Sequence, residues 1–183
     1  MKPESSKTTQ LEHGVFVAMY GLGMLIRGPA GIGKSSLALE LIDRGHAFVS
    51  DDVVQFRSMP SITASESTII VGSAPPMLQN LLAVRDIGVL DISELYESKT
   101  ILCNHILDFI IQLTPHAHPT AQNITNPYNE SLILDHKFPN QQIFAHASRN
   151  LALIVETALK NYILYKNGQD AGRTLISRQQ QYL

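Results

Sequence analysis

The sequence predicts an α/β fold in which helices flank a mixed sheet and one strand leads into a phosphate-binding loop. Residues 28–35 read GPAGIGKS, which matches G-x-x-x-x-G-K-[ST] at every fixed position. A short apolar run, residues 23–27, precedes this motif and suits a buried strand. Residues 35–44 follow with apolar side chains at helical spacing, and Gly45 suits the end of a helix. The order strand, loop and helix is the context that the motif requires.

The loop has the residues that bind the phosphates of a nucleotide. Backbone N–H groups of a glycine-rich turn at a helix N-terminus surround phosphates with donors and a favourable dipole. Lys34 adds positive charge for the outer phosphates, and the Ser35 hydroxyl is a ligand for the accompanying Mg²⁺. The alternative is a glycine-rich turn with a solvated Lys34, which the flanking strand and helix disfavour. The expected nucleotide-binding residues are Gly28, Pro29, Ala30, Gly31, Ile32, Gly33, Lys34 and Ser35.

Two β-prone runs precede the loop. Residues 13–20 and 23–27 are separated by a glycine-containing turn and predict a hairpin whose second strand leads into the loop. In the ordinary nucleotide-binding βαβ unit, the loop follows a strand that is reached by a parallel crossover. Residues 1–12 include a stretch rich in Lys, Ser and Thr, and we expect them to form a flexible tail.

Another apolar run, residues 46–50, is followed by Asp51 and Asp52. An acidic residue at a strand end soon after a phosphate-loop helix is where nucleotide enzymes order Mg²⁺ or accept a proton. Adjacent strand residues point to opposite faces, so only one of the two carboxylates can face the phosphates if the strand continues. The alternative is an acidic turn before a further strand at residues 53–56.

The rest of the chain predicts one domain over residues 13–166 and a terminal helix or tail over residues 167–183. A helix is expected to begin at Pro75 or Pro76. Its apolar residues are Met77, Leu78, Leu81 and Leu82. The other expected elements are strands at 68–71, 101–113, 131–134 and 142–145, loops at 58–67 and 114–130, and helices at 149–165 and 170–182. The last helix is polar, and we expect it to pack on a neighbouring subunit.

Composition excludes two classes of partner. The formal net charge is −2 and no basic cluster occurs, so nucleic acid is not an expected partner. No run of 18 apolar residues occurs, so no membrane span is expected. The single cysteine, Cys103, cannot form an internal disulfide, and its apolar neighbours predict a packed thiol. These features predict a cytoplasmic protein.

A set of motifs, in order from His13 to about Tyr165, resembles the catalytic domain of HPr kinase/phosphorylase. The phosphate loop alone is generic, whereas the ordered set is specific. The other matching segments are residues 13–15 (HGV), 39–46 (LELIDRGH), 51–52 (DD), 72–76 (GSAPP), 84–91 (VRDIGVLD) and 149–152 (RNLA) with Glu156.

The resemblance implies a nucleotide domain similar to that of phosphoenolpyruvate carboxykinase, which accounts for the hairpin before the loop. It implies an ATP- and Mg²⁺-dependent kinase that phosphorylates a seryl hydroxyl of the small phosphocarrier protein HPr and so regulates carbohydrate metabolism. It also implies a homo-oligomer, since members of the family assemble as hexamers. Carried over by position, Asp51 is the acid/base catalyst, and His13 and Lys34 are its active-site partners. Ser35 is then a magnesium ligand, and Asp52 is the second candidate ligand.

The sequence also departs from the family pattern. Ala83 stands where the family has a glutamate that helps to hold magnesium, and Asp86 is three residues away. No arginine occurs between Arg85 and Arg149, although the family has an active-site arginine there. Residues 144–149 keep only the arginine of the stretch linked to the reverse reaction, so phosphorolysis is the less expected direction. These departures predict weakened activity and leave two alternatives: a nucleotide-binding regulator with little catalysis, or a kinase of a small hydroxylated molecule.

Overall fold

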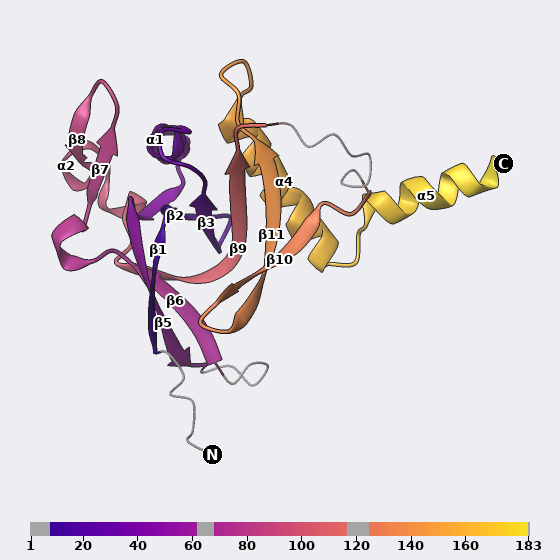
Figure 1. Ribbon diagram of the computed structural model, residues 1–183, viewed down its shortest axis with the longest axis horizontal. Helices are drawn as coiled ribbons and strands as arrows, with labels where there is room; N and C mark the ends of the chain where they lie inside the picture. Colours follow the sequence, from indigo (N-terminus) through magenta and orange to yellow (C-terminus); the bar gives the residue numbers. More distant parts are fainter. Residues whose placement is uncertain (1–7, 62–67, 117–124, 183) are drawn as a thin grey trace.

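A curled nine-stranded mixed sheet forms the centre of the computed structural model, which describes residues 8–61, 68–116 and 125–182 (Figure 1). Its strands are β1 (Thr9–His13), β2 (Val15–Met19), β3 (Leu22–Arg27), β4 (Ala47–Ser50), β5 (Val53–Pro60), β6 (Thr68–Ser73), β9 (Asn104–Thr114), β10 (Tyr128–Ile133) and β11 (His136–Phe144). A separate hairpin consists of β7 (Leu81–Val84) and β8 (Gly88–Asp91). The helical elements are α1 (Lys34–Asp43), η1 (Pro76–Leu78), α2 (Ile92–Leu95), η2 (Ser98–Thr100), α4 (Leu151–Lys166) and α5 (Ala171–Gln181).

The longest strand, β9, organises the sheet. The main strand order is β1-β5-β6-β9-β3-β2-β4, and β11 pairs with β9 and with β10. Strand β9 runs parallel to β3 and to β11, whereas its first residues pair antiparallel with β6. The mixed sheet that the sequence predicts is therefore present. The phosphate loop begins at the C-terminal end of β3, which lies between β9 and β2 in the sheet.

Two apolar cores lie on the two faces of the sheet. Helices α1 and α4 cover one face, where Leu41 and Leu159 are fully buried together with residues of β2, β3 and β9. On the other face the sheet curls over itself and encloses a second cluster that includes Phe16, Phe56 and Ile110. The rings of Phe16 and Phe56 meet edge to face at 5.4 Å. The sheet is thus held from both sides, and α1 is fixed against it.

The structure confirms most of the expected elements. Strands β2 and β3 form the predicted antiparallel hairpin, with Val15 opposite Ile26. Helix α4 begins after the N-cap Asn150, whose side chain accepts a hydrogen bond from the Leu153 N–H. Helix α5 begins in the same way after Asp170, whose side chain accepts from the Arg173 N–H.

Several expectations are wrong. The loops expected at 58–67 and 114–130 are each shortened by a strand, because β5 continues to Pro60 and β10 begins at Tyr128. The helix expected from Pro75 or Pro76 is a single 3₁₀ turn, η1, and Leu81 and Leu82 instead belong to strand β7, because pairing with β8 buries Leu82 completely. Cys103 is exposed and not a packed thiol, because it lies in the bend before β9. The tail expected over residues 1–12 is wrong for residues 9–12, which pair with β5 as part of β1; residues 1–7 lie outside the described residues.

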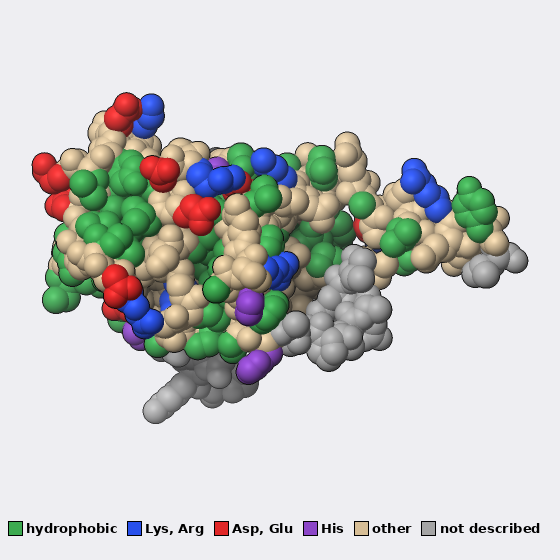
Figure 2. All heavy atoms as spheres, turned by 90° about the horizontal axis from the view of Figure 1, so that it is seen from above, with side chains coloured by type: hydrophobic (Ala, Val, Ile, Leu, Met, Phe, Trp, Pro, Cys, Tyr) green, Lys and Arg blue, Asp and Glu red, His purple; other side chains and the backbone are tan. Residues whose placement is uncertain are grey.

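Helix α5 stands away from the rest of the molecule (Figure 1 and Figure 2). It buries none of its residues, all of which are described, whereas α4 buries six of its own. Leu175 and Ile176 of α5 are each 42% exposed. In the described part of the chain, no helix combines the length and the apolar character needed to cross a membrane.

Candidate active site

The phosphate loop connects the end of β3 to the start of α1. Gly33 occupies the N-cap position with φ 98° and ψ 21°, a left-handed conformation that glycine adopts without steric cost. The first turn of α1 contains no acidic side chain, so no carboxylate of this helix repels an anion at its N-terminus. The sequence motif therefore folds as a loop before a helix with an available positive dipole end.

Lys34 curls back along the loop that precedes it. Its Nζ donates hydrogen bonds to the carbonyl oxygens of Gly28 at 3.0 Å and of Pro29 at 3.1 Å. The ammonium group is thus held at the loop, within the motif that places such a lysine against the outer phosphates.

Ser35 and Asp51 are in direct contact, although they are 16 positions apart in the sequence. The Ser35 hydroxyl lies 3.0 Å from Oδ1 and 3.1 Å from Oδ2 of Asp51 and donates a hydrogen bond to this carboxylate. The backbone N–H of Ala83 donates to Oδ2 at 3.1 Å. Asp51 is only 4% exposed, and this burial raises the pKa of its carboxyl group, while the bonds from Ala83 and Ser35 act in the opposite direction. A carboxylate with a raised pKa is the better proton acceptor.

Asp52 and His13 lie at the margin of this arrangement. Asp52 has a positive φ of 65° and is exposed, and its carbonyl oxygen accepts a hydrogen bond from the Gly14 N–H at 3.0 Å. His13 ends β1 opposite Val53 and is also exposed. Among the described residues, the carboxylate in contact with Ser35 is that of Asp51, and no hydrogen bond joins His13 to Asp51. The magnesium role of Asp52 and the catalytic role of His13 stay predictions.

A pocket of about 260 Å³ opens in front of the loop. Its lining residues are Gly31, Gly33, Lys34, Ser35, Ser36, Ala83 and Arg85. Ser35 and Ala83, the two groups that contact Asp51, both face it, so the Asp51 carboxylate lies directly behind the pocket wall. We call this cavity the phosphate pocket.

Arg85 and Ser36 line the pocket although sequence reasoning did not assign them to the site, and Arg85 is the charged one of the two. A Cβ atom added to Gly31 would lie 3.3 Å from the Arg85 guanidinium, which shows how closely this arginine approaches the loop. Little in the sequence indicated this role for Arg85. A helix was expected over the preceding residues, so the β7–β8 hairpin that carries Arg85 was not predicted. The guanidinium adds a second cation, besides Lys34, to this pocket, and cations of this kind bind phosphate.

A partly buried ion pair holds the C-terminal end of α1, away from the pocket. Glu156 of α4 is 6% exposed and accepts bonds from Arg44 Nε at 2.9 Å and from a terminal guanidinium nitrogen at 2.6 Å. His46 Nε2 lies 2.9 Å from the same carboxylate. The Arg44 guanidinium is the main cause that lowers the pKa of Glu156 to about 2. Because Arg44 directly follows α1, this pair joins the far end of that helix to α4.

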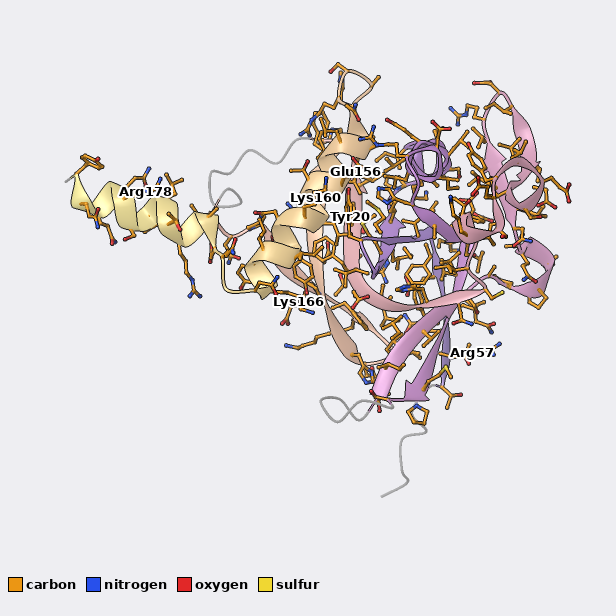
Figure 3. The ribbon with its side chains drawn as sticks, turned by 180° about the vertical axis from the view of Figure 1, so that it is seen from behind. Tyr20, Arg57, Glu156, Lys160, Lys166 and Arg178 are labelled. Atoms are coloured by element: carbon orange, nitrogen blue, oxygen red, sulfur yellow. The ribbon has the colours of Figure 1, made fainter. Side chains whose placement is uncertain are left out.

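The same corner contains Tyr20 and Lys160, which Figure 3 labels beside Glu156. The Tyr20 ring meets the His46 ring edge to face at 5.1 Å, and Lys160 Nζ lies 5.0 Å from the centre of the Tyr20 ring. These contacts are structural, because they lie at the opposite end of α1 from the phosphate loop.

The donors present suit a magnesium ion that arrives with a nucleotide. Mg²⁺ prefers oxygen ligands and is commonly held by one or two carboxylates together with substrate phosphates. Ser35 and Asp51 supply a hydroxyl and a carboxylate in contact with each other. No cluster of three or more His, Cys, Asp or Glu side chains that could hold a metal occurs among the described residues. The residues thus fit a metal that shares its ligands with phosphate.

The comparisons with known proteins agree with this geometry. The family model described as HPr Serine kinase C-terminal domain matches residues 4–179. The chain is 37% identical over 170 residues to HPr kinase/phosphorylase of Stenotrophomonas maltophilia strain K279a, and 38% identical over 168 residues to that of Burkholderia lata. These matches cover 91% of this chain but 52% and 50% of the relatives, so the chain spans about half of their length.

A solved structure shows the same fold. The HPr(Ser) kinase/phosphatase from Coxiella burnetii superposes with a TM-score of 0.77 at 32% sequence identity, over 91% of this chain and 98% of that one. The predicted fold class is therefore confirmed. With a family model that matches nearly the whole sequence and a phosphate pocket built from its motifs, the chain belongs to the family of HPr serine kinase C-terminal domains.

Proposed function

We propose that this chain transfers the γ-phosphoryl group of ATP to a seryl hydroxyl of the phosphocarrier protein HPr. The observation that carries the proposal is the contact of Ser35 with the buried Asp51 at the wall of a pocket that also presents Lys34 and Arg85. The names of the relatives support HPr as the acceptor.

Each group has a distinct task in the proposed reaction. The loop amides and Lys34 bind the phosphates, and Arg85 adds positive charge that stabilises the phosphoryl group during transfer. A bound Mg²⁺ would neutralise charge at the phosphate oxygens, with the Ser35 hydroxyl as its proposed protein ligand and Asp52 as the second candidate.

The acceptor hydroxyl enters beside Ser35 and Ala83, the two pocket residues that contact Asp51. The serine oxygen forms the new bond to the γ-phosphorus as the bond to the β,γ-bridging oxygen breaks, and ADP leaves. Asp51 takes the proton that the serine hydroxyl loses, an aid typically worth about 10² to 10⁴ in rate. Its raised pKa, caused by burial, favours this proton transfer.

The direct test is purified protein with ATP, Mg²⁺ and purified HPr, followed by mass spectrometry for phosphoserine. We expect one phosphoryl group on HPr and its loss in the variant Asp51→Asn. Titration calorimetry with ATP separates the alternatives. Nucleotide binding without transfer to HPr would favour a nucleotide-binding regulator. Transfer to a small hydroxylated molecule instead of HPr would favour a small-molecule kinase.

We also propose that the protein works as a homo-oligomer in which α5 packs on a neighbouring subunit. Support comes from α5 itself, which leaves Leu175 and Ile176 partly exposed and buries none of its described residues. Light scattering of the full chain and of a variant with Leu175→Ser and Ile176→Ser tests this: an unchanged mass would contradict the role of α5.

A further inference from the structure

The β7–β8 hairpin presents an apolar outer face at the rim of the phosphate pocket. Ala83 and Val89 are direct cross-strand partners, so their side chains share one face of the hairpin, about 4.5–5.5 Å apart at Cβ. Ala83 lines the phosphate pocket, and Val89 beside it is 68% exposed. The other face packs into the core through Leu82 and Val84, which are buried. The exposed side of the hairpin is therefore continuous with the pocket.

Two further exposed apolar side chains belong to the same hairpin and to the helix that follows it. Ile87, at the turn of the hairpin, is 61% exposed, and Leu95, on the short helix α2 that directly follows β8, is 58% exposed. We call Ile87, Val89 and Leu95 the docking face. Figure 2 shows hydrophobic side chains on the left-hand part of the molecule, where Figure 1 places β7, β8 and α2. Single exposed apolar residues are ordinary, but a group of them at the rim of an active site marks an interaction surface.

Acidic side chains surround the docking face. Asp86 lies at the hairpin turn, Asp91 ends β8, and Glu94 is on α2; all three are exposed. Glu97, further along, is paired with Lys99 at 2.7 Å. An apolar centre with a carboxylate rim is complementary to a partner surface with an apolar centre and a basic rim.

We propose that the docking face binds the protein acceptor, at a segment where apolar residues and lysine or arginine side chains flank the target serine. This inference rests on the proposed function and adds to it the surface that selects the substrate. The hydroxyl must reach the pocket between Ser35 and Ala83, so the residues next to it come to lie on Val89 and its neighbours. A nucleotide base or a second copy of the chain would be a different occupant.

The test measures binding of HPr separately from turnover. Calorimetry gives the Kd of HPr for the wild-type protein and for a double variant with Ile87→Ser and Val89→Ser. We expect the Kd to rise about tenfold or more, because truncated anchors at an interface centre have effects of this size. The matched control is Leu132→Ser on β10, where the leucine is 59% exposed and remote from the pocket in the sheet order. Its Kd should equal that of the wild type.

A charge variant gives a second, independent measurement. Glu94→Lys should weaken HPr binding at low salt and lose that effect at high salt, whereas the exposed Glu130→Lys on β10 should do neither. Thermal unfolding of every variant checks that the fold is intact.

Each outcome decides the proposal. Unchanged HPr binding in both the apolar and the charge variants would overturn it, as would a wild-type protein that does not bind HPr. A loss of ATP affinity would assign the docking face to the nucleotide, and a fall in molecular mass would assign it to a second copy; either result overturns the proposal. Wild-type protein that binds HPr through this face without phosphorylating it would confirm the surface and contradict the proposed function.

Discussion

Replacing Glu156 by glutamine tests how strongly its partly buried ion pair with Arg44 stabilises the fold. The pKa of Glu156 falls from its ordinary 4.5 to about 2. At about 1.4 kcal/mol for each pKa unit, this fall corresponds to roughly 3.5 kcal/mol. Because the Arg44 side chain is 37% exposed, water screens the pair. We therefore expect Glu156→Gln to lower the free energy of unfolding by about 1–2 kcal/mol at pH 7.

The pH dependence of the Glu156→Gln effect has a definite sign. A carboxyl group whose pKa is lowered by folding adds stability above its unfolded pKa, here 4.5, and loses it as the pH falls toward about 2. Urea unfolding of wild type and variant at pH 7, 4.5 and 3 should therefore show a difference that shrinks with the pH. The control is Glu130→Gln, an exposed pair with Lys137, which should stay within about 0.5 kcal/mol. Equal differences at pH 7 and pH 3 would refute the reasoning.

Four changes in the pocket test the proposed roles of its residues. Asp51→Asn should lower phosphoryl transfer by about 10² or more, because it removes the proposed base, and unchanged transfer would contradict that role. The same variant should raise the melting temperature at pH 7. The pKa of this buried carboxyl group is raised, so its charged form lowers the stability of the fold at every pH above its ordinary pKa of 3.8. Lys34→Met should weaken ATP binding in calorimetry, since it removes the lysine charge at the outer phosphates. The affinity for ADP should fall less than the affinity for ATP. Arg85→Met should weaken ATP binding about tenfold or more, because a hydrogen bond to a charged group contributes about 1.5–3 kcal/mol; an unaltered Kd would place this arginine outside the phosphate contacts. Ala83→Glu should reduce the Mg²⁺ concentration needed for half-maximal transfer, because it adds a carboxylate beside Asp51.

The local parts of the site were predictable from the sequence because their signals are short-range. Residues 28–35 identify the loop, and the apolar spacing of residues 35–44 identifies α1, which buries Leu37, Ala38, Leu41 and Ile42 as expected. The β2–β3 hairpin was predictable for the same reason, since a glycine turn between two β-prone runs pairs neighbouring strands.

The β7–β8 hairpin was the main failure of local reasoning. Two prolines followed by four apolar residues suggested a helix, but the chain forms one 3₁₀ turn and then a strand. Tertiary packing overrides propensity here, because pairing Leu82 with Leu90 places Leu82 in the core beneath α1 and α4. With the hairpin misjudged, the position of Arg85 in the pocket could not be foreseen.

The sequence by itself determined that a phosphate loop follows a hairpin strand, that a helix follows the loop and that two aspartates follow the next strand, since each depends on residues close together along the chain. Only the tertiary structure decided that Asp51 and not Asp52 contacts Ser35, that Arg85 reaches the loop and that Glu156 holds Arg44. These contacts join residues 16 to 112 positions apart, and their geometry depends on how the strands and helices pack around the buried strand β9.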